Sequence, residues 1–234
     1  MDHNNSAESL FEIQTNGTIS YNLGESLSVV VGSRDDSGWS WGLPTSNLEK
    51  AYKDEGDSIR ELWTILHHNQ TYVPNDNTWS KDKPYIITPK DHKSARANMK
   101  LFIPTAKRPS PYDGPHINLN YRLLRYADVL LMYAEVENAL GNDVEARGAL
   151  NAVRKRVNLS DVTSSGTTLR DAIRKERRLE LALEDNRLYD LRRWNDDNGK
   201  KAIENLMGAN GTFVHYNLVE STDQYEISNQ NENS

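Results

Sequence analysis

The chain has 234 residues, no cysteine and a formal net charge of −6 at pH 7. Without cysteine it can form neither a disulfide framework nor a thiolate metal site, and its acidic balance disfavours nucleic-acid binding, which needs a coherent basic face. The hydrophobic fraction of 36% is below the ~45–50% usual in globular proteins, which indicates a compact core joined to long polar loops.

The sequence shows neither a membrane-spanning helix nor a signal peptide. The longest apolar runs, 27–31 and 129–134, are far shorter than the ~20 residues that a helix needs to cross a bilayer. The first nine residues, MDHNNSAES, have neither the basic region nor the apolar region of a secretory signal. From these residues alone, we expect that the chain as written does not direct its own export.

The composition divides the chain near Pro115. Residues 1–117 contain the prolines and four of the five tryptophans, and are predicted to form a loop-rich region with short helices and strands. Thr45 or Ser46 can cap a first helix, with Glu49 in its first turn. The predicted elements of this region are helices at 45–52 and 58–66, strands at 27–31 and 85–88, and a long loop at 69–84.

Residues 118–234 are predicted to be mainly helical. Apolar residues cover nearly every side of a first helix, which Asn118 or Asn120 can cap and which ends at Gly141, so we expect neighbours all around it. Capping-box spacings then open a second helix at Asn142 and a third at Thr168. The short connection between the first two helices predicts an antiparallel helical hairpin.

Two carboxylates, Asp128 and Glu176, fall inside the apolar stripes of the predicted helices. A buried charge is costly unless it is paired, so we expect ion pairs with nearby arginines. The candidate partners are Arg122, Arg125, Arg177 and Arg178. A catalytic carboxylate pair is the alternative, but so many arginines would not leave either carboxylate the raised pKa that a general acid needs. We therefore interpret the set as structural ion pairs that fix helix register.

The usual sequence signatures of catalytic and cofactor sites are missing. His67 and His68 are adjacent and would point to different sides of a helix. The sequence contains no H-E-x-x-H metal motif, no G-x-S-x-G elbow and no glycine-rich phosphate loop. It accordingly predicts no metal, no cofactor and no enzymatic activity.

Three segments, taken in order, carry a resemblance to a known family. They are RLLRYADVLLMYAE at 122–135, the pattern A-x-x-x-L-N-x-V-R at 146–154, and ERRLELALEDNRLYDLRRW at 176–194. They resemble the C-terminal signature of the SusD/RagB family, lipoproteins that capture glycans or other nutrients at the outer membrane of Bacteroidetes. The resemblance implies tetratricopeptide-like helical hairpins around an irregular region, a surface-exposed location and a TonB-dependent outer-membrane transporter as partner.

The chain also departs from the family pattern. Family members carry a signal peptide, a lipid-modified cysteine and about half of the fold before the matching region. We therefore expect a truncated copy, a misplaced start or one piece of a split gene, in which 1–117 and 118–234 together make one incomplete domain. The loss of stacked neighbours would expose apolar surface and lower stability. Asp185 stands where glycine is usual, and Leu188 where an aromatic residue is common.

A sugar ligand needs an exposed aromatic plane beside a few polar groups, usually on loops. Residues 1–117 offer such aromatics, and the resemblance implies that this part binds the ligand; the candidates are Trp79, Tyr72, Trp39 and Trp41. The alternative for each is packing onto the core, which we favour for the pair Trp39 and Trp41 and for Trp63 on its predicted helix. Trp79, in the most polar loop, is the preferred ligand contact.

The resulting expectation is a glycan- or nutrient-binding accessory protein without catalysis. Two other classes stay open. An intracellular helical-repeat scaffold for a protein partner would explain the hairpin, but not the aromatic loops. A glycoside hydrolase would explain aromatics and carboxylates together. Cleavage of a bound glycan would support the hydrolase, whereas binding without cleavage supports the accessory protein.

Overall fold

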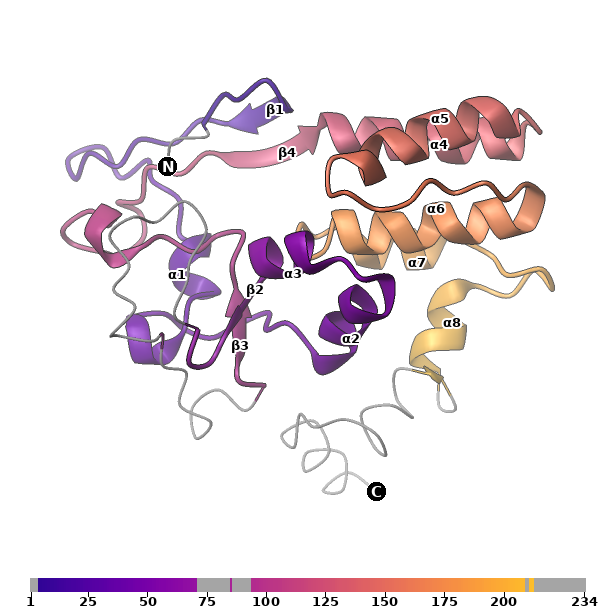
Figure 1. The fold of residues 1–234 in the computed structure, drawn as a ribbon. Coiled ribbons are helices and arrows are strands. Elements are labelled where there is room, and N and C mark those ends of the chain that lie inside the picture. Colours follow the sequence, from indigo (N-terminus) through magenta and orange to yellow (C-terminus); the bar gives the residue numbers. More distant parts are fainter. Residues whose placement is uncertain (1–3, 71–84, 86–93, 209–210, 213–234) are drawn as a thin grey trace.

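The structure is a computed structural model, and it describes residues 4–70, 85, 94–208 and 211–212. Figure 1 shows a mostly helical molecule, in which a ribbon of two strands leads into a stack of helices and shorter helices pack against that stack. The predicted mostly helical class is confirmed.

The largest core lies between three helices, α4 (Tyr126–Ala139), α5 (Asp143–Lys155) and α6 (Gly166–Glu180). Small and branched apolar side chains fill it: Ala127, Leu131, Ala134, Ala146, Ala149, Leu150, Val153, Leu169 and Ile173. The alanines let α4 and α5 approach each other closely. Gly141, with a φ of +84°, takes the left-handed conformation in the tight turn between them, so the predicted helical hairpin is confirmed.

The N-terminal part adds two helices to this stack. α2 (Ser46–Glu55) begins where the Thr45 hydroxyl accepts a hydrogen bond from the Leu48 amide, as predicted, and it ends at Gly56, with a φ of +71°. α3 (Ser58–Thr64) follows directly and is capped by Asp57. A second core cluster draws on both parts of the chain: Leu48, Tyr52, Ile65, Leu179 and Ala182. The loop-rich and helical parts therefore share hydrophobic packing.

Two short antiparallel ribbons and several short helices complete the described fold. β1 (Ser9–Ile13) pairs with β4 (Tyr121–Arg125), and β2 (Ile65–His67) pairs with β3 (Arg96–Asn98). The short helices are α1 (Leu27–Val30), η1 (Arg34–Asp36), η2 (Thr105–Lys107), α7 (Arg187–Arg193) and α8 (Ala202–Met207). β4 runs straight into α4 (Figure 1), so the ribbon fixes where the helical stack begins.

The segment 27–31, predicted as a strand, is instead the short helix α1. The Glu25 carboxylate accepts a hydrogen bond from the Ser28 amide at 3.1 Å, which starts the turn, and Val29 packs with Ile103 and Ile117. A short apolar run has no period that distinguishes strand from helix. Its packing decides, and here the packing selects the helix.

The helix predicted after Asn120 begins later than expected. Its first residues form β4, because β1 supplies a partner strand, and α4 starts at Tyr126. Neither predicted capping box forms. The Asn142 side chain donates to Glu137 at 2.7 Å, and α6 begins at Gly166, whose amide donates to the Asp143 carboxylate at 2.8 Å. Neighbouring residues thus provide the polar contacts that local spacing was expected to provide.

Two predictions from the first part remain mostly outside the described residues. Tyr85 forms an isolated antiparallel bridge with Gln70, while the rest of the strand predicted at 85–88 is not described. The loop predicted at 69–84 is described only at its first two residues.

Candidate functional site

The predicted carboxylates both lie in the interior, where they hold helices together. Asp128, 7% exposed, accepts a hydrogen bond from Arg177 at 2.8 Å, and Arg177 also pairs with Asp190 of α7 at 3.1 Å. This chain of charges ties α4, α6 and α7 to one another. Both the burial of Asp128 and its pairing with Arg177 are confirmed.

Glu176 is 1% exposed and bridges two other helices. Its carboxylate accepts from Arg60 of α3 at 2.5 Å and from Arg154 of α5 at 2.8 Å. Neither arginine is among the partners predicted from the sequence, although the predicted ion pairing of Glu176 is confirmed. The sequence gives no local signal for these contacts, since Arg60 lies 116 residues away.

The other predicted arginines have separate roles. Arg125 pairs with Glu180 at 2.6 Å, Glu184 at 2.7 Å and Glu8 at 3.2 Å. Arg122 pairs with Glu12 across the β1–β4 ribbon at 3.2 Å. Arg178 donates to the Asn47 side chain at 2.5 Å and to no carboxylate in the described ranges. Pairing of Arg122, Arg125 or Arg178 with Asp128 or Glu176 was therefore a wrong prediction.

Electrostatics in this network favour ionised carboxylates. Burial raises the pKa of Glu180, but Arg125 and Arg156 outweigh that effect and lower it to about 2. Burial likewise acts on Glu184, yet Lys100 and Arg125 lower its pKa below the ordinary value. A carboxyl group held ionised in this way is a poor general acid, so the network is structural in character.

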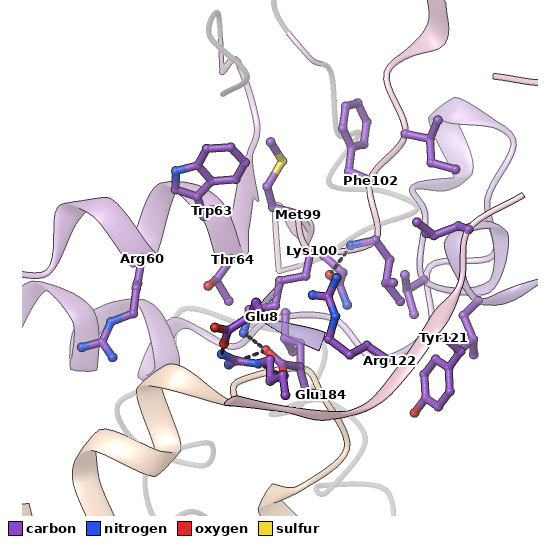
Figure 2. A pocket seen from close by; sticks show the side chains of 18 of the residues that line it. Glu8, Arg60, Trp63, Thr64, Met99, Lys100, Phe102, Tyr121, Arg122 and Glu184 are labelled. Carbon is purple, nitrogen blue, oxygen red and sulfur yellow. Dashed lines mark hydrogen bonds and ion pairs between the residues drawn. The ribbon is translucent and has the colours of Figure 1, made fainter. Parts of the chain in front are cut away.

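A cavity of about 750 Å³ lies above this network, between the β1–β4 ribbon, α3 and the segment that follows β3. In Figure 2, Trp63, Met99 and Phe102 occupy one side of it, whereas Glu8, Arg122 and Glu184 occupy the opposite side. One wall is thus apolar and aromatic, and the other presents charged hydrogen-bonding groups. Such a combination suits a ligand that has both apolar faces and many polar groups.

Trp63 was expected in the core, but its position is different. It is 42% exposed and lines the apolar wall of the cavity (Figure 2). Its helix buries Arg60 and Thr64 instead. The charged network draws Arg60 inward, so the helix presents Trp63 to the cavity.

Trp39 and Trp41 come just before Gly42 in the chain, and neither is among the residues that line the cavity. Their ring centroids are 5.8 Å apart in an edge-to-face arrangement, and the residues are 52% and 60% exposed. Their backbone amides donate to the carbonyls of Val29 and Val30, each at 3.0 Å, which holds this segment against α1. Gly42, the next residue, lines the cavity. Packing onto the core, which the sequence favoured for this pair, is wrong: both indoles face outward.

The remaining two predicted ligand contacts, Tyr72 and Trp79, lie outside the described residues. The structure therefore places Trp63, unexpectedly, in the cavity lining, whereas Trp39 and Trp41 adjoin the lining residue Gly42 in the chain. One feature of the sequence could have indicated the position of Trp63. Arg60, one turn earlier in the same short helix, is a charged residue among apolar positions.

One group in the described ranges has the composition of a metal site. Glu49, Glu61 and His67 each place a ligand atom within 4.8 Å of the others. Glu49, however, already accepts from Arg96 at 2.6 Å and pairs with Lys53. With protein cations already at Glu49, we assign no metal to this group.

Comparison with known proteins decides the family. The model of the SusD family matches residues 7–234. The chain belongs to this family. SusD-like protein P38 of Formosa agariphila is 40% identical over 103 residues, which cover 39% of this chain and 19% of that protein.

Solved structures of SusD-like proteins share the fold. A laminarin-binding SusD-like protein is 26% identical with a TM-score of 0.65. The match covers 87% of this chain and 44% of that protein's chain. A SusD-like protein from Bacteroides fragilis is 26% identical with a TM-score of 0.60, over 81% of this chain and 43% of its own. A SusD homologue from Bacteroides thetaiotaomicron is 28% identical with a TM-score of 0.58, over 80% of this chain and 41% of that protein's chain. This SusD family chain thus spans less than half the length of these relatives. Among its described helices, none has the length and apolar character needed to traverse a bilayer.

Proposed function

We propose that this protein is a carbohydrate-binding accessory protein without catalytic activity, which binds its ligand across the cavity that Trp63 lines and the exposed indole pair, Trp39 and Trp41, that precedes the lining residue Gly42. The observation that carries the proposal is the exposure of this indole pair next to Gly42, a lining residue of a large cavity with one apolar and one charged wall. Indole faces stack on the apolar C–H faces of sugars, while Glu8, Arg122 and Glu184 offer partners for hydroxyl groups.

Membership of the SusD family supports the proposal, as does the similarity to a laminarin-binding relative. We extend it to the location and partner that the family resemblance implies: the outer-membrane surface, beside a TonB-dependent transporter. Neither the intracellular scaffold nor the glycoside hydrolase has comparable support. The buried carboxylates are held ionised by arginines, which disfavours the acid chemistry of a hydrolase.

Affinity electrophoresis in gels that contain laminarin or other polysaccharides tests the proposal. We expect at least one polysaccharide to retard the parent protein without release of reducing ends. Trp41→Ala and Trp39→Ala should each weaken binding about tenfold, or ~1.4 kcal/mol, because a stacking surface is lost.

Tyr133→Ala is the matched control, since this tyrosine is 46% exposed on α4, away from the cavity lining. It should leave mobility unchanged. Trp79→Ala, in the same gels, tests the contact that the sequence favoured. If both Trp39→Ala and Trp41→Ala were retarded as strongly as the parent, the indole pair would not be part of the binding site.

A further inference from the structure

A second, smaller cleft lies at the other end of the molecule, between α6, α7 and α8. It has a volume of about 360 Å³, and four cationic side chains line it: Arg174, Lys175, Arg178 and Arg187. Asp196 is its only acidic lining residue among the described parts of the chain. The cleft shares no lining residue with the cavity proposed for carbohydrate.

The acidic residue does not neutralise these cations. The Asp196 carboxylate accepts hydrogen bonds from the amides of Asn198 and Lys200, both at 2.9 Å, and from the Asn205 side chain at 2.7 Å. Lys175 pairs with Glu55 on the neighbouring helix α2. The three arginines are thus left without a carboxylate inside the described part of the cleft.

Each arginine is also incompletely hydrogen-bonded. Arg174 donates to the Asn195 carbonyl at 2.9 Å, but its buried Nε has no acceptor among the described residues. Arg178 reaches only Asn47. Arg187 donates to no group that the structure describes. A guanidinium carries five N–H donors in a fixed fork, so this cleft presents many unused donors.

Two of these guanidinium groups lie against the ring of Trp194. The Cζ atoms of Arg174 and Arg187 lie 5.1 Å and 5.9 Å from the centroid of its ring, and the indole lines the cleft. Stacking against the buried ring holds both guanidinium groups in place without neutralising their charge. The site is therefore preorganised toward an incoming anion.

Burial of these charges is costly, and it lowers the pKa of each arginine. Burial and the neighbouring Arg178 lower the pKa of Arg187 to about 10. Burial also lowers the pKa of Arg178 and, together with Arg170, that of Arg174. A bound anion would relieve this cost, since it would supply both the missing charge and the missing acceptors.

We propose that the cleft between α6, α7 and α8 is an oxyanion-binding site, in which Arg174, Arg178 and Arg187 bind a carboxylate, sulfate or phosphate group. Two sources can supply such a group. One is a separate anionic molecule. The other is the chain itself, since residues 213–234 contain no lysine or arginine and four acidic residues: Glu220, Asp223, Glu226 and Glu232.

Inorganic sulfate is the probe. The melting temperature is followed while sulfate replaces chloride at constant ionic strength, and a site that binds sulfate gives a saturable rise. Arg187→Gln should shift the midpoint of this rise at least about tenfold, or ~1.4 kcal/mol, to higher sulfate. Arg187→Lys keeps the positive charge but loses the paired N–H donors of the planar guanidinium, so it should also weaken sulfate binding. Arg192→Gln, an exposed position on the same helix, is the matched control and should behave like the parent.

A variant in which the four acidic residues of 213–234 become amides separates the two sources. If a separate anion is the ligand, parent and amide variant respond to sulfate alike. If the chain's own carboxylates fill the site, the parent is insensitive and the amide variant gains a response that Arg187→Gln abolishes. The proposal is overturned if neither protein responds, or if Arg187→Gln does not change the response.

Discussion

At the scale of single residues, arginines and carboxylates inside the helical stack form a network of ion pairs. Glu176 is the centre of it, because one carboxylate bridges Arg60 of α3 and Arg154 of α5. All three side chains are at most about a tenth exposed, so water cannot replace a lost partner. Such a bridge contributes specificity of packing, since only one arrangement of the helices satisfies every charge.

Removal of this carboxylate should therefore be costly. We expect Glu176→Gln to lower the free energy of unfolding by about 1.5–3 kcal/mol, because two buried guanidinium groups each lose a charged acceptor, although Asp57 and Glu180 still pair with Arg60 and Glu55 with Arg154. Urea unfolding at neutral pH measures it. Glu145→Gln, at an exposed position of α5, should change stability by less than about 0.5 kcal/mol. A Glu176→Gln loss as small as that of the control would contradict the structural role.

At the scale of elements, α2 contacts α6 through a buried tyrosine as well as through Asn47 and Glu55. Tyr52 is fully buried, and its hydroxyl donates to the Leu179 carbonyl near the end of α6 at 2.6 Å. The carbonyls of a last helical turn lack partners within the helix, so this contact satisfies one of them. Burial raises the pKa of Tyr52, which keeps the hydroxyl a donor at physiological pH.

Tyr52→Phe isolates this contact, since it removes the hydroxyl and keeps the ring. We expect a loss of about 1–3 kcal/mol in the free energy of unfolding, because the buried carbonyl stays unsatisfied. Thermal or urea unfolding gives the value. Tyr133→Phe, at an exposed position of α4, serves as the control and should be nearly neutral. Equal stability of the two variants would mean that the Tyr52 hydroxyl does not help to hold α2 against α6.

At the scale of the whole molecule, residues 1–117 and 118–234 share the core around Tyr52 and the charged network below the cavity. We propose that the two parts form a single domain, in which the helical stack supports the cavity. The apolar contacts are non-directional, whereas the ion pairs fix how the parts meet. Acid should therefore loosen the whole assembly.

The pH dependence has a definite sign. The folded-state pKa of Glu180 is about 2 against an ordinary 4.5, so its contribution is fully present above about pH 4.5 and is lost as the pH falls toward 2. The difference corresponds to ~3 kcal/mol for this buried group. Unfolding free energies measured from neutral to acidic pH should show this fall. Glu180→Gln should be less stable at neutral pH and show a shallower fall; an identical slope would refute the assignment.

The sequence by itself determined the features that depend on neighbours within a few turns. The helical hairpin around Gly141, the Thr45 cap and the burial of Asp128 and Glu176 follow from local periodicity and composition, and the ordered motifs at 122–194 pointed to the family. Tertiary structure alone decided the rest. The partners of Glu176, the helical form of 27–30 and the outward position of Trp39, Trp41 and Trp63 depend on residues far apart in the chain. Local patterns fix which side chains must be buried, but only packing decides which distant group neutralises a charge or leaves a ring exposed.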